Sequence, residues 1–150
     1  MNNADFVWCF VPHGYADGAG IDDPPLALDG RRSVRETSRN LTNIPAIIVH
    51  SPLKRAVETA QLLGSVTPDF KGSLYPCEWL LPDVKILHAV DYLLEHYAGI
   101  DALFVGHNPL LNQILEHFGE RHERPMDYAE QVTISMRDHI APATRKRATG

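Results

Sequence analysis

The sequence predicts an α/β fold, a three-layer sandwich with a mainly parallel central sheet and helices on both faces. Short apolar segments typical of buried strands alternate along the 150 residues with segments of helical periodicity, which favours a parallel sheet covered on both sides. Three of the strand-like segments end in polar residues. Ligands bind such sheets outside the carboxyl ends of the strands, so these residues predict a binding site.

The first half of the chain predicts two strands, each followed by a helix. Apolar, β-branched and aromatic residues predict the first buried strand, and a segment rich in glycine, aspartate and proline predicts the loop after it. The next helix carries an aspartate in its first turn, where the helix dipole favours negative charge. In order, these elements are a strand at Phe6–Val11, a loop at Tyr15–Pro25, a helix at Leu28–Leu41 and a strand at Ala46–Val49.

Two strand ends continue into a polar residue and a proline, a pattern typical of a helix start. Ser51-Pro52 predicts a helix that ends at Gly64, and Asn108-Pro109 predicts the start of another. Each start would direct unpaired backbone N–H groups and a positive dipole end toward the same edge of the sheet.

The second half of the chain continues the alternation. A weaker strand is interrupted by a proline, and the helix after it has Asp83 as its predicted N-cap. In order, we expect a strand at Leu74–Leu80, a helix that ends near Gly99, a strand at Ala102–Val105 and a last strand at Val132–Met136.

The composition suits one compact domain spanning residues 1–150. A net charge of −5 and a pI of about 5.9 do not favour nucleic-acid binding. The basic cluster Arg145–Arg147 lies in a tail that we expect to be mobile from about residue 140. Cys9 and Cys77 lie in apolar segments and are expected to be free thiols. No apolar segment has membrane-spanning length or the form of a secretory signal, so we expect a cytoplasmic protein that binds no membrane.

The polar residues at the strand ends suit a small anion such as phosphate. His13 follows the first strand, Arg55 lies near the start of the second helix, and His107 follows the strand at Ala102–Val105. An imidazole can attack phosphorus and carry the phosphoryl group covalently, and a guanidinium binds phosphoryl oxygens in a bidentate manner. We expect no metal and no other cofactor at this site.

Three segments resemble the signature segments of the histidine phosphatase superfamily. They are His13-Gly14, Ser51–Ala60 and Val105–Pro109, in the family's order. The small size resembles the compact branch, the phosphohistidine phosphatases of the SixA type, and the segment Leu26–Gly30 resembles that family's first helix start. The resemblance implies a phosphoglycerate mutase-like fold.

The resemblance also implies a role for each matching residue. His13 matches the phosphoacceptor, and Gly14, Arg55 and His107 match residues that bind the phosphoryl group. Of these, His107 also matches the histidine that stabilises the transition state. Many members keep a general acid in the segment that contains Glu78, with Asp83 as the other candidate in this chain.

Two residues depart from the family pattern. Pro12 stands where the family has an arginine beside the nucleophile, and Ala27 replaces the usual threonine cap. Loss of a helix cap costs about 1 kcal/mol, whereas loss of one preorganised donor at a transition state lowers the rate by roughly 10²–10³. We therefore expect a lower rate. Arg31, Arg32 and Arg35 are expected on a solvated face of the following helix; in the alternative, one of them reaches the site and replaces the missing charge.

The predicted function is that of a phosphohistidine phosphatase, which forms a phosphohistidine intermediate on its own chain. Its substrate would be a phosphorylated protein or a small phosphorylated molecule. One alternative, motivated by Pro12, is a non-catalytic relative that binds phosphate or phosphoproteins. Another is a metal-dependent hydrolase that uses His13, His50 and His107.

Two residues keep a second interpretation at this stage. His50 lies either in the wall of the site or in solvent. Arg55 either binds phosphate or forms an ion pair with Glu58, three residues on in the same predicted helix.

Overall fold

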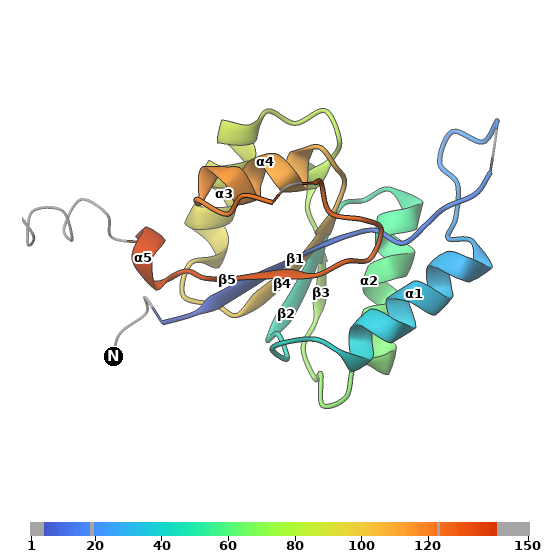
Figure 1. The fold of residues 1–150 in the computed structure, drawn as a ribbon, viewed down its shortest axis with the longest axis horizontal. Helices are drawn as coiled ribbons and strands as arrows, with labels where there is room; N and C mark the ends of the chain where they lie inside the picture. The colour runs from blue at the N-terminus through green and yellow to red at the C-terminus, as the bar shows by residue number, and fades with distance from the viewer. Residues whose placement is uncertain (1–4, 19, 123, 141–150) are drawn as a thin grey trace, which may run out of the picture.

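One sheet organises the part of the chain that the computed structural model describes, which is residues 5–18, 20–122 and 124–140. Its five strands lie in the order β3-β2-β4-β1-β5 (Figure 1). The strands are β1 (Val7–Pro12), β2 (Ile47–His50), β3 (Leu74–Pro76), β4 (Ala102–Gly106) and β5 (Val132–Ser135).

Helices cover both faces of this sheet and complete three layers. Figure 1 shows α1 and α2 on one face and α3 and α4 on the other. The helices are α1 (Leu28–Arg39), α2 (Lys54–Val66), α3 (Ile86–Tyr97), α4 (Leu110–His117) and the short α5 (Arg137–Ile140), with a 3₁₀ helix η1 (Glu78–Leu80) before α3. The predicted fold class is confirmed.

The strand register brings the predicted site residues to one edge. Strand β4 pairs in parallel with β1 and β2, which places Pro12 opposite Gly106 and His50 opposite Val105. Only β5 runs antiparallel among the described strands. The chain therefore leaves β1, β2 and β4 at the same edge of the sheet, where its next residues gather.

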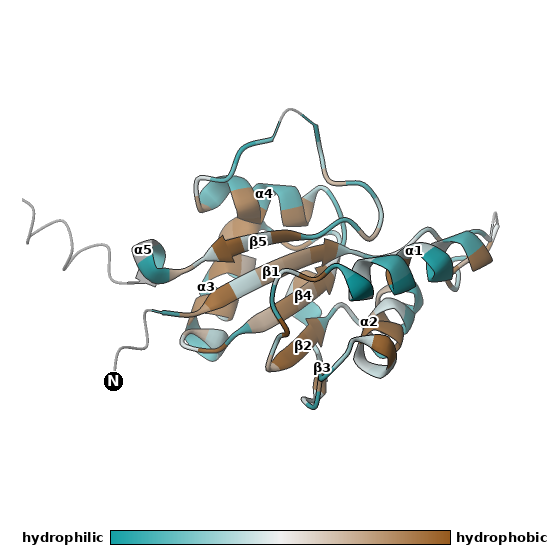
Figure 2. Cartoon of the chain, turned by 60° about the horizontal axis from the view of Figure 1, so that its bottom comes forward, coloured by the Kyte–Doolittle hydropathy of each residue, from teal (hydrophilic) through white to brown (hydrophobic). Residues whose placement is uncertain are grey.

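The apolar side chains form a cluster on each face of the sheet. Trp8, Phe10 and Phe104 are fully buried on the side covered by α3 and α4, whereas Leu103 and Val105 are buried on the side of α1 and α2. Figure 2 shows hydrophobic strands between helices whose outward surfaces are hydrophilic. Each such buried side chain contributes roughly 1.5–3 kcal/mol to stability, and together they hold the strand ends in place.

The two helix starts predicted from a polar residue and a proline are wrong. Helix α2 begins at Lys54, continues through Gly64 to Val66 and has no side-chain cap at its N-cap residue. The N–H of Lys54 instead donates to Oδ1 of Asp23 at 2.9 Å, so the cap comes from the loop before α1. Helix α4 likewise begins at Leu110 without a cap from Asn108.

The predicted elements around Pro76 are also corrected. Strand β3 ends at Pro76, which has no N–H for the ladder, and residues 78–80 form η1. Helix α3 begins at Ile86 with Lys85 at its N-cap position, so Asp83 does not cap it. Helix α1 begins as predicted at Leu28 and ends at Arg39, and Ala27 supplies no side-chain cap.

No helix in the described ranges is long and apolar enough to cross a membrane. The basic cluster Arg145–Arg147 and almost all of the predicted tail lie outside the described residues. That residues 1–150 make up one domain stays a prediction.

Candidate active site

His13 follows the last residue of β1 and is half-buried at the sheet edge. Its N–H donates to the carbonyl of Gly106 at 3.0 Å, which continues the ladder between β1 and β4. Its ring nitrogen Nδ1 lies 2.7 Å from the carbonyl oxygen of Gly14. Because a carbonyl only accepts, this contact assigns the proton to Nδ1 and leaves a lone pair on Nε2 of the neutral ring.

Gly14 is held between α1 and α2, and it fixes the backbone that carries His13. Its N–H donates to Oγ1 of Thr59 at 3.0 Å, and that hydroxyl donates to the carbonyl of Arg55 at 2.8 Å. A Cβ at position 14 would lie 2.9 Å from Cγ2 of Val34 and 3.0 Å from the carbonyl oxygen of Gly30. This close approach of α1 explains the glycine after the histidine.

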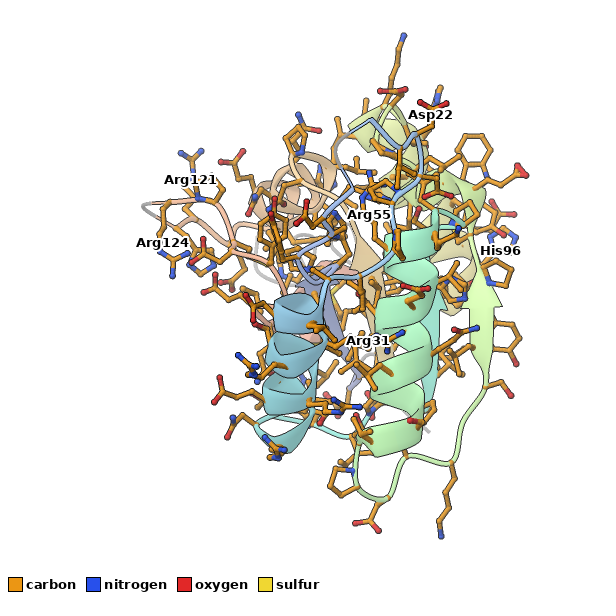
Figure 3. All side chains as sticks on the ribbon, turned by 90° about the vertical axis from the view of Figure 1, so that its right-hand side faces the viewer. Asp22, Arg31, Arg55, His96, Arg121 and Arg124 are labelled. Atoms are coloured by element: carbon orange, nitrogen blue, oxygen red, sulfur yellow. The ribbon has the colours of Figure 1, made fainter. Side chains whose placement is uncertain are left out.

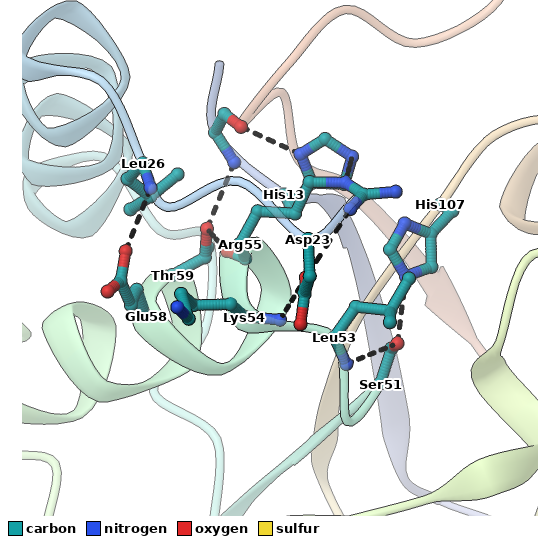
Figure 4. A network of polar contacts seen from close by, with 11 residues as sticks. His13, Asp23, Leu26, Ser51, Leu53, Lys54, Arg55, Glu58, Thr59 and His107 are labelled. Atoms are coloured by element: carbon teal, nitrogen blue, oxygen red, sulfur yellow. Dashed lines mark hydrogen bonds and ion pairs between the residues drawn. The ribbon is translucent and has the colours of Figure 1, made fainter. Parts of the chain in front are cut away.

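Arg55 lies in the first turn of α2 and reaches His13. Its Nε–H donates to Nε2 of His13 at 3.3 Å, and its Nη1 lies 3.7 Å from Oδ1 of Asp23 (Figure 4). The alternative interpretation, an ion pair with Glu58, is not seen among the described residues: the ion pair of Arg55 is with Asp23, and the Glu58 carboxylate accepts the N–H of Leu26 at 2.8 Å. The guanidinium therefore points into the site, with its side chain 20% exposed.

His107 follows β4 and is buried, with 2% of its surface exposed. Its ring centre lies 5.0 Å from that of His13. Its Nε2 lies 2.8 Å from Oγ of Ser51, whereas its Nδ1 is buried and has no hydrogen-bond partner in the structure. The predicted trio of His13, Arg55 and His107 is thus brought together from three different elements.

Burial makes both imidazoles poor bases. Burial, together with smaller effects of the nearby His13 and Arg55, lowers the pKa of His107 to about 3. Burial also lowers the pKa of His13, and the charge of Arg55 acts in the same direction, while the hydrogen bond to Gly14 opposes the shift. At neutral pH both rings are therefore uncharged, and the guanidinium of Arg55 is the cation beside them.

A cavity of about 430 Å³ opens over His13 and Arg55. It is lined by Pro12, His13, Ala16, Pro24, Arg55, Asn108, Met126, Asp127 and Tyr128. The ring of Tyr128 lies 5.6 Å, centre to centre, from those of both His13 and Tyr15. Sequence reasoning missed Asp127 and Tyr128, because they stand in a segment with no periodicity and no motif.

Pro12 takes part in positioning the segment that carries Asp127 and Tyr128. Its carbonyl accepts the N–H of Ala129 at 2.9 Å. Ala129 has a φ of 61°, a left-handed conformation that is unusual for a residue with a Cβ, and its carbonyl accepts Oγ1–H of Thr37 at 2.5 Å. Pro12 therefore contributes an uncharged surface to the cavity.

The structure leaves both candidate acids outside the cavity. Glu78 lies exposed on η1, and Asp83 lies exposed between η1 and α3. Neither lines the cavity over His13, and the only carboxylate among the lining residues is Asp127. The general acid role of Glu78 and Asp83 stays a prediction that this arrangement does not support.

None of the three candidate arginines of α1 lines the cavity. Arg32 pairs instead with Asp29 on the exposed face of α1, at 3.2 Å. Figure 3 shows Arg31 between α1 and α2, away from Arg55 at the start of α2. The charge missing at Pro12 is thus not replaced from this helix.

His50 is buried, and its Nδ1 lies 2.9 Å from the carbonyl oxygen of Ser51. It does not line the cavity. Within the described residues, no three His, Cys, Asp or Glu side chains are placed to hold a metal ion. The trio of His13, His50 and His107 therefore does not form a metal site in this structure.

An α/β sandwich with two histidines and an arginine at the strand ends defines a class of fold with a sheet edge suited to a small anion, and comparison with known proteins agrees with the fold. The family model of the histidine phosphatase superfamily (branch 1) matches residues 9–71. This range contains His13 and Arg55 but ends before His107. No curated protein matches the chain in sequence.

Solved structures of this class share the fold over most of the chain. The protein histidine phosphatase SixA complexed with tungstate is 19% identical, with a TM-score of 0.72 over 85% of this chain and 86% of its own. SixA from Agrobacterium tumefaciens is 14% identical, with a TM-score of 0.73 over 86% and 90%. A mycobacterial glucosyl-3-phosphoglycerate phosphatase is 18% identical, with a TM-score of 0.62 over 85% and 89%. The resemblance to the histidine phosphatase superfamily that the motifs predict is confirmed.

Proposed function

We propose that this chain is a phosphatase that transfers the phosphoryl group of its substrate to Nε2 of His13, and that its substrate is phosphohistidine on a protein. The observation that carries this proposal is the meeting of His13, Arg55 and His107 at one sheet edge. Nε2 of His13 accepts a hydrogen bond from Arg55 at 3.3 Å, and the ring of His107 is centred 5.0 Å from that of His13.

In the first step, the lone pair on Nε2 of His13 attacks phosphorus. A bond forms between that nitrogen and phosphorus as the bond to the leaving group breaks, and the leaving group takes its proton from water. The lowered pKa of His13 keeps Nε2 unprotonated near neutral pH, and the N–H of Arg55 that Nε2 accepts in the empty site turns to the phosphoryl group in this step. Arg55 donates to the phosphoryl oxygens, on which the negative charge of the transition state is spread.

In the second step, water attacks the phosphohistidine. The new bond to oxygen forms as the bond between phosphorus and Nε2 breaks, and the proton of water passes to solvent. Inorganic phosphate then leaves the cavity, and His13 regains its lone pair. The hydrogen bond from Nδ1 to the carbonyl of Gly14, at 2.7 Å, keeps the ring in the same tautomer for both steps.

The choice of substrate rests on the leaving group. Among the residues that line the cavity, Asp127 is the only carboxylate; its side chain is 80% exposed and 3.4 Å from Nη1 of Arg124. Among the described residues, no buried carboxylate therefore lines the cavity. A P–N bond to imidazole needs less help from an acid than a bond to an alkoxide, which favours phosphohistidine.

A second candidate function is supported by Pro12, which lines the cavity where the family has an arginine. In this alternative, the chain binds phosphate or a phosphoprotein with Arg55 and does not turn it over. The two functions differ in one measurable property, the release of phosphate.

The test measures phosphate release from a phosphohistidine protein and from an aryl phosphate, with a chelator present. The variants are the native chain, His13→Ala and His96→Ala. His96 is the matched control, since it lies exposed on α3, away from Arg55 (Figure 3). We expect turnover by the native chain and by His96→Ala, and at least a roughly thousandfold loss in His13→Ala.

Alkaline denaturation during turnover should trap phosphate on His13 of the native chain, because the P–N bond of phosphohistidine survives in base and is hydrolysed in acid. Absence of turnover with phosphate binding retained would favour the binding protein. Loss of activity on adding the chelator would contradict the metal-free mechanism. Equal turnover of both substrates would support the phosphatase activity but contradict the preference for phosphohistidine.

A further inference from the structure

The buried hydroxyl of Ser51 has two partners in the structure. Oγ of Ser51 accepts the N–H of Leu53 at 3.2 Å and lies 2.8 Å from Nε2 of His107. Ser51 is fully buried, with 0% of its surface exposed. A hydroxyl has one hydrogen to donate, and a buried donor without an acceptor costs stability.

The hydrogen of this hydroxyl has one acceptor within reach. The N–H of Leu53 can only donate, which leaves Nε2 of His107 as the partner that accepts. Nε2 then carries a lone pair. Since the ring of His107 is neutral, its single proton must lie on Nδ1.

The opposite arrangement of protons leaves the serine hydrogen unpaired. If Nε2 of His107 carried the proton, it would donate to Ser51, and the serine hydrogen would have no acceptor among the described residues in a fully buried position. The buried Nδ1, which has no partner in the structure in either arrangement, would then carry a lone pair. That lone pair would repel the oxygens of a phosphoryl group.

Nδ1 of His107 lies on the side of the ring that faces His13 and Arg55 (Figure 4). It is buried and has no hydrogen-bond partner among the described residues. A donor in this position would bond a phosphoryl oxygen held by Arg55. The one unpartnered polar atom of His107 is thus the atom that the proposed reaction requires as a donor.

We propose that Ser51 is a positioning residue that fixes His107 in the tautomer with the proton on Nδ1, so that this N–H donates to the phosphoryl group. Ser51 itself touches no substrate. The identity of the ligand as a phosphoryl group rests on the proposed function. The tautomer of His107 does not, because it is a property of the chain without any ligand. The hydroxyl of Ser51, between β2 and α2, thereby determines which ring nitrogen of His107, after β4, donates a hydrogen bond and which accepts one.

The test has two readouts besides activity. The first is the ¹⁵N NMR spectrum of the imidazole of His107, which reports the protonated ring nitrogen directly. The second is the affinity for inorganic phosphate, measured by calorimetry. The variants are Ser51→Ala, Ser51→Thr and the matched control Ser38→Ala, a buried serine whose hydroxyl donates to the carbonyl of Arg35 within α1.

In the native chain we expect the proton of His107 on Nδ1. Ser51→Ala should move a large part of it to Nε2 and weaken phosphate binding about tenfold, the effect of one lost hydrogen bond. Ser51→Thr keeps the hydroxyl and should restore the native tautomer. Ser38→Ala should change neither readout.

A native His107 protonated on Nε2 would overturn the proposal, as would Ser51→Ala with native tautomer and affinity. Ser51→Ala is smaller than the native residue and introduces no clash, so the result does not depend on whether the threonine fits. A chain that shows the expected tautomer and phosphate affinity but releases no phosphate would contradict the proposed phosphatase and leave the role of Ser51 standing.

Discussion

Two walls of the same cavity are built differently. We call the first the cationic wall; it consists of Arg55 with His107 and Ser51 behind it. Its side chains are held by hydrogen bonds and are half or fully buried. The other, the Tyr128 wall, consists of Pro12, Asp127 and Tyr128, of which Tyr128 is 55% exposed.

The difference lies in what each wall offers to an anion. The cationic wall presents the guanidinium of Arg55 to the cavity, while His107, whose ring nitrogen Nδ1 is buried and unpartnered, does not itself line it. The Tyr128 wall presents a proline, a carboxylate and an aromatic ring. One side of the cavity therefore carries a positive charge held in place by hydrogen bonds, and the other contributes shape without positive charge.

The largest effect is expected from breaking the cationic wall. Arg55→Ala removes the only arginine or lysine that lines the cavity. It should lower kcat/KM for phosphate release by roughly 10²–10³, the usual cost of one preorganised donor. Steady-state kinetics measure this loss. Arg32→Ala, which removes an exposed arginine of α1, should leave the rate unchanged, and an equal loss in that variant would contradict the assignment.

A smaller effect, in the opposite direction, is expected from charging the Tyr128 wall. Pro12→Arg places a cation beside His13 and should raise kcat/KM by about tenfold or more, because it adds a second donor to the transition state. Pro12→Gln has a long side chain and a backbone N–H but no charge, and it should raise the rate much less. Equal kcat/KM values for the two variants would contradict the prediction that the positive charge at position 12 raises the rate.

A separate effect, on stability and not on rate, tests the burial of the cationic wall. The pKa of His107 is lowered to about 3, so below pH 6.5 the unfolded chain binds a proton that the folded chain does not. The free energy of unfolding should therefore fall by about 1.4 kcal/mol for each unit of pH between about 6 and 3. His107→Gln should lack this contribution. Urea unfolding at several pH values, without phosphate, compares the two slopes, and parallel slopes would contradict a buried neutral ring.

Much of the cationic wall could be predicted from the sequence. The strands before His13 and His107 are short, wholly apolar segments, and a parallel sheet brings their carboxyl ends together. Arg55 follows from its spacing after β2. The partners that hold these residues follow less directly, because Ser51 has the residue type of a helix cap and its hydroxyl is instead shared between Leu53 and His107.

The Tyr128 wall could not be predicted. The segment before β5 carries no periodicity, and its position depends on contacts with residues far away in sequence. Asn108 looks like a helix cap, yet its Nδ2–H donates to the carbonyl of Met126 at 2.9 Å. The N–H of Ala129 donates to Pro12, more than a hundred residues earlier. Local patterns contain no record of such pairings.

Asp23 is a further residue of the site that the sequence did not predict, and it has a consequence for the proposed turnover. This half-exposed carboxylate caps α2 at Lys54 and lies 3.7 Å from Nη1 of Arg55. An arginine in an empty cavity would retain any small anion from solution, its own product included. In the proposed phosphatase, a tethered counter-ion that exchanges with phosphate would shorten the residence of the product, so the loop before α1 would favour release as well as assembly of the site.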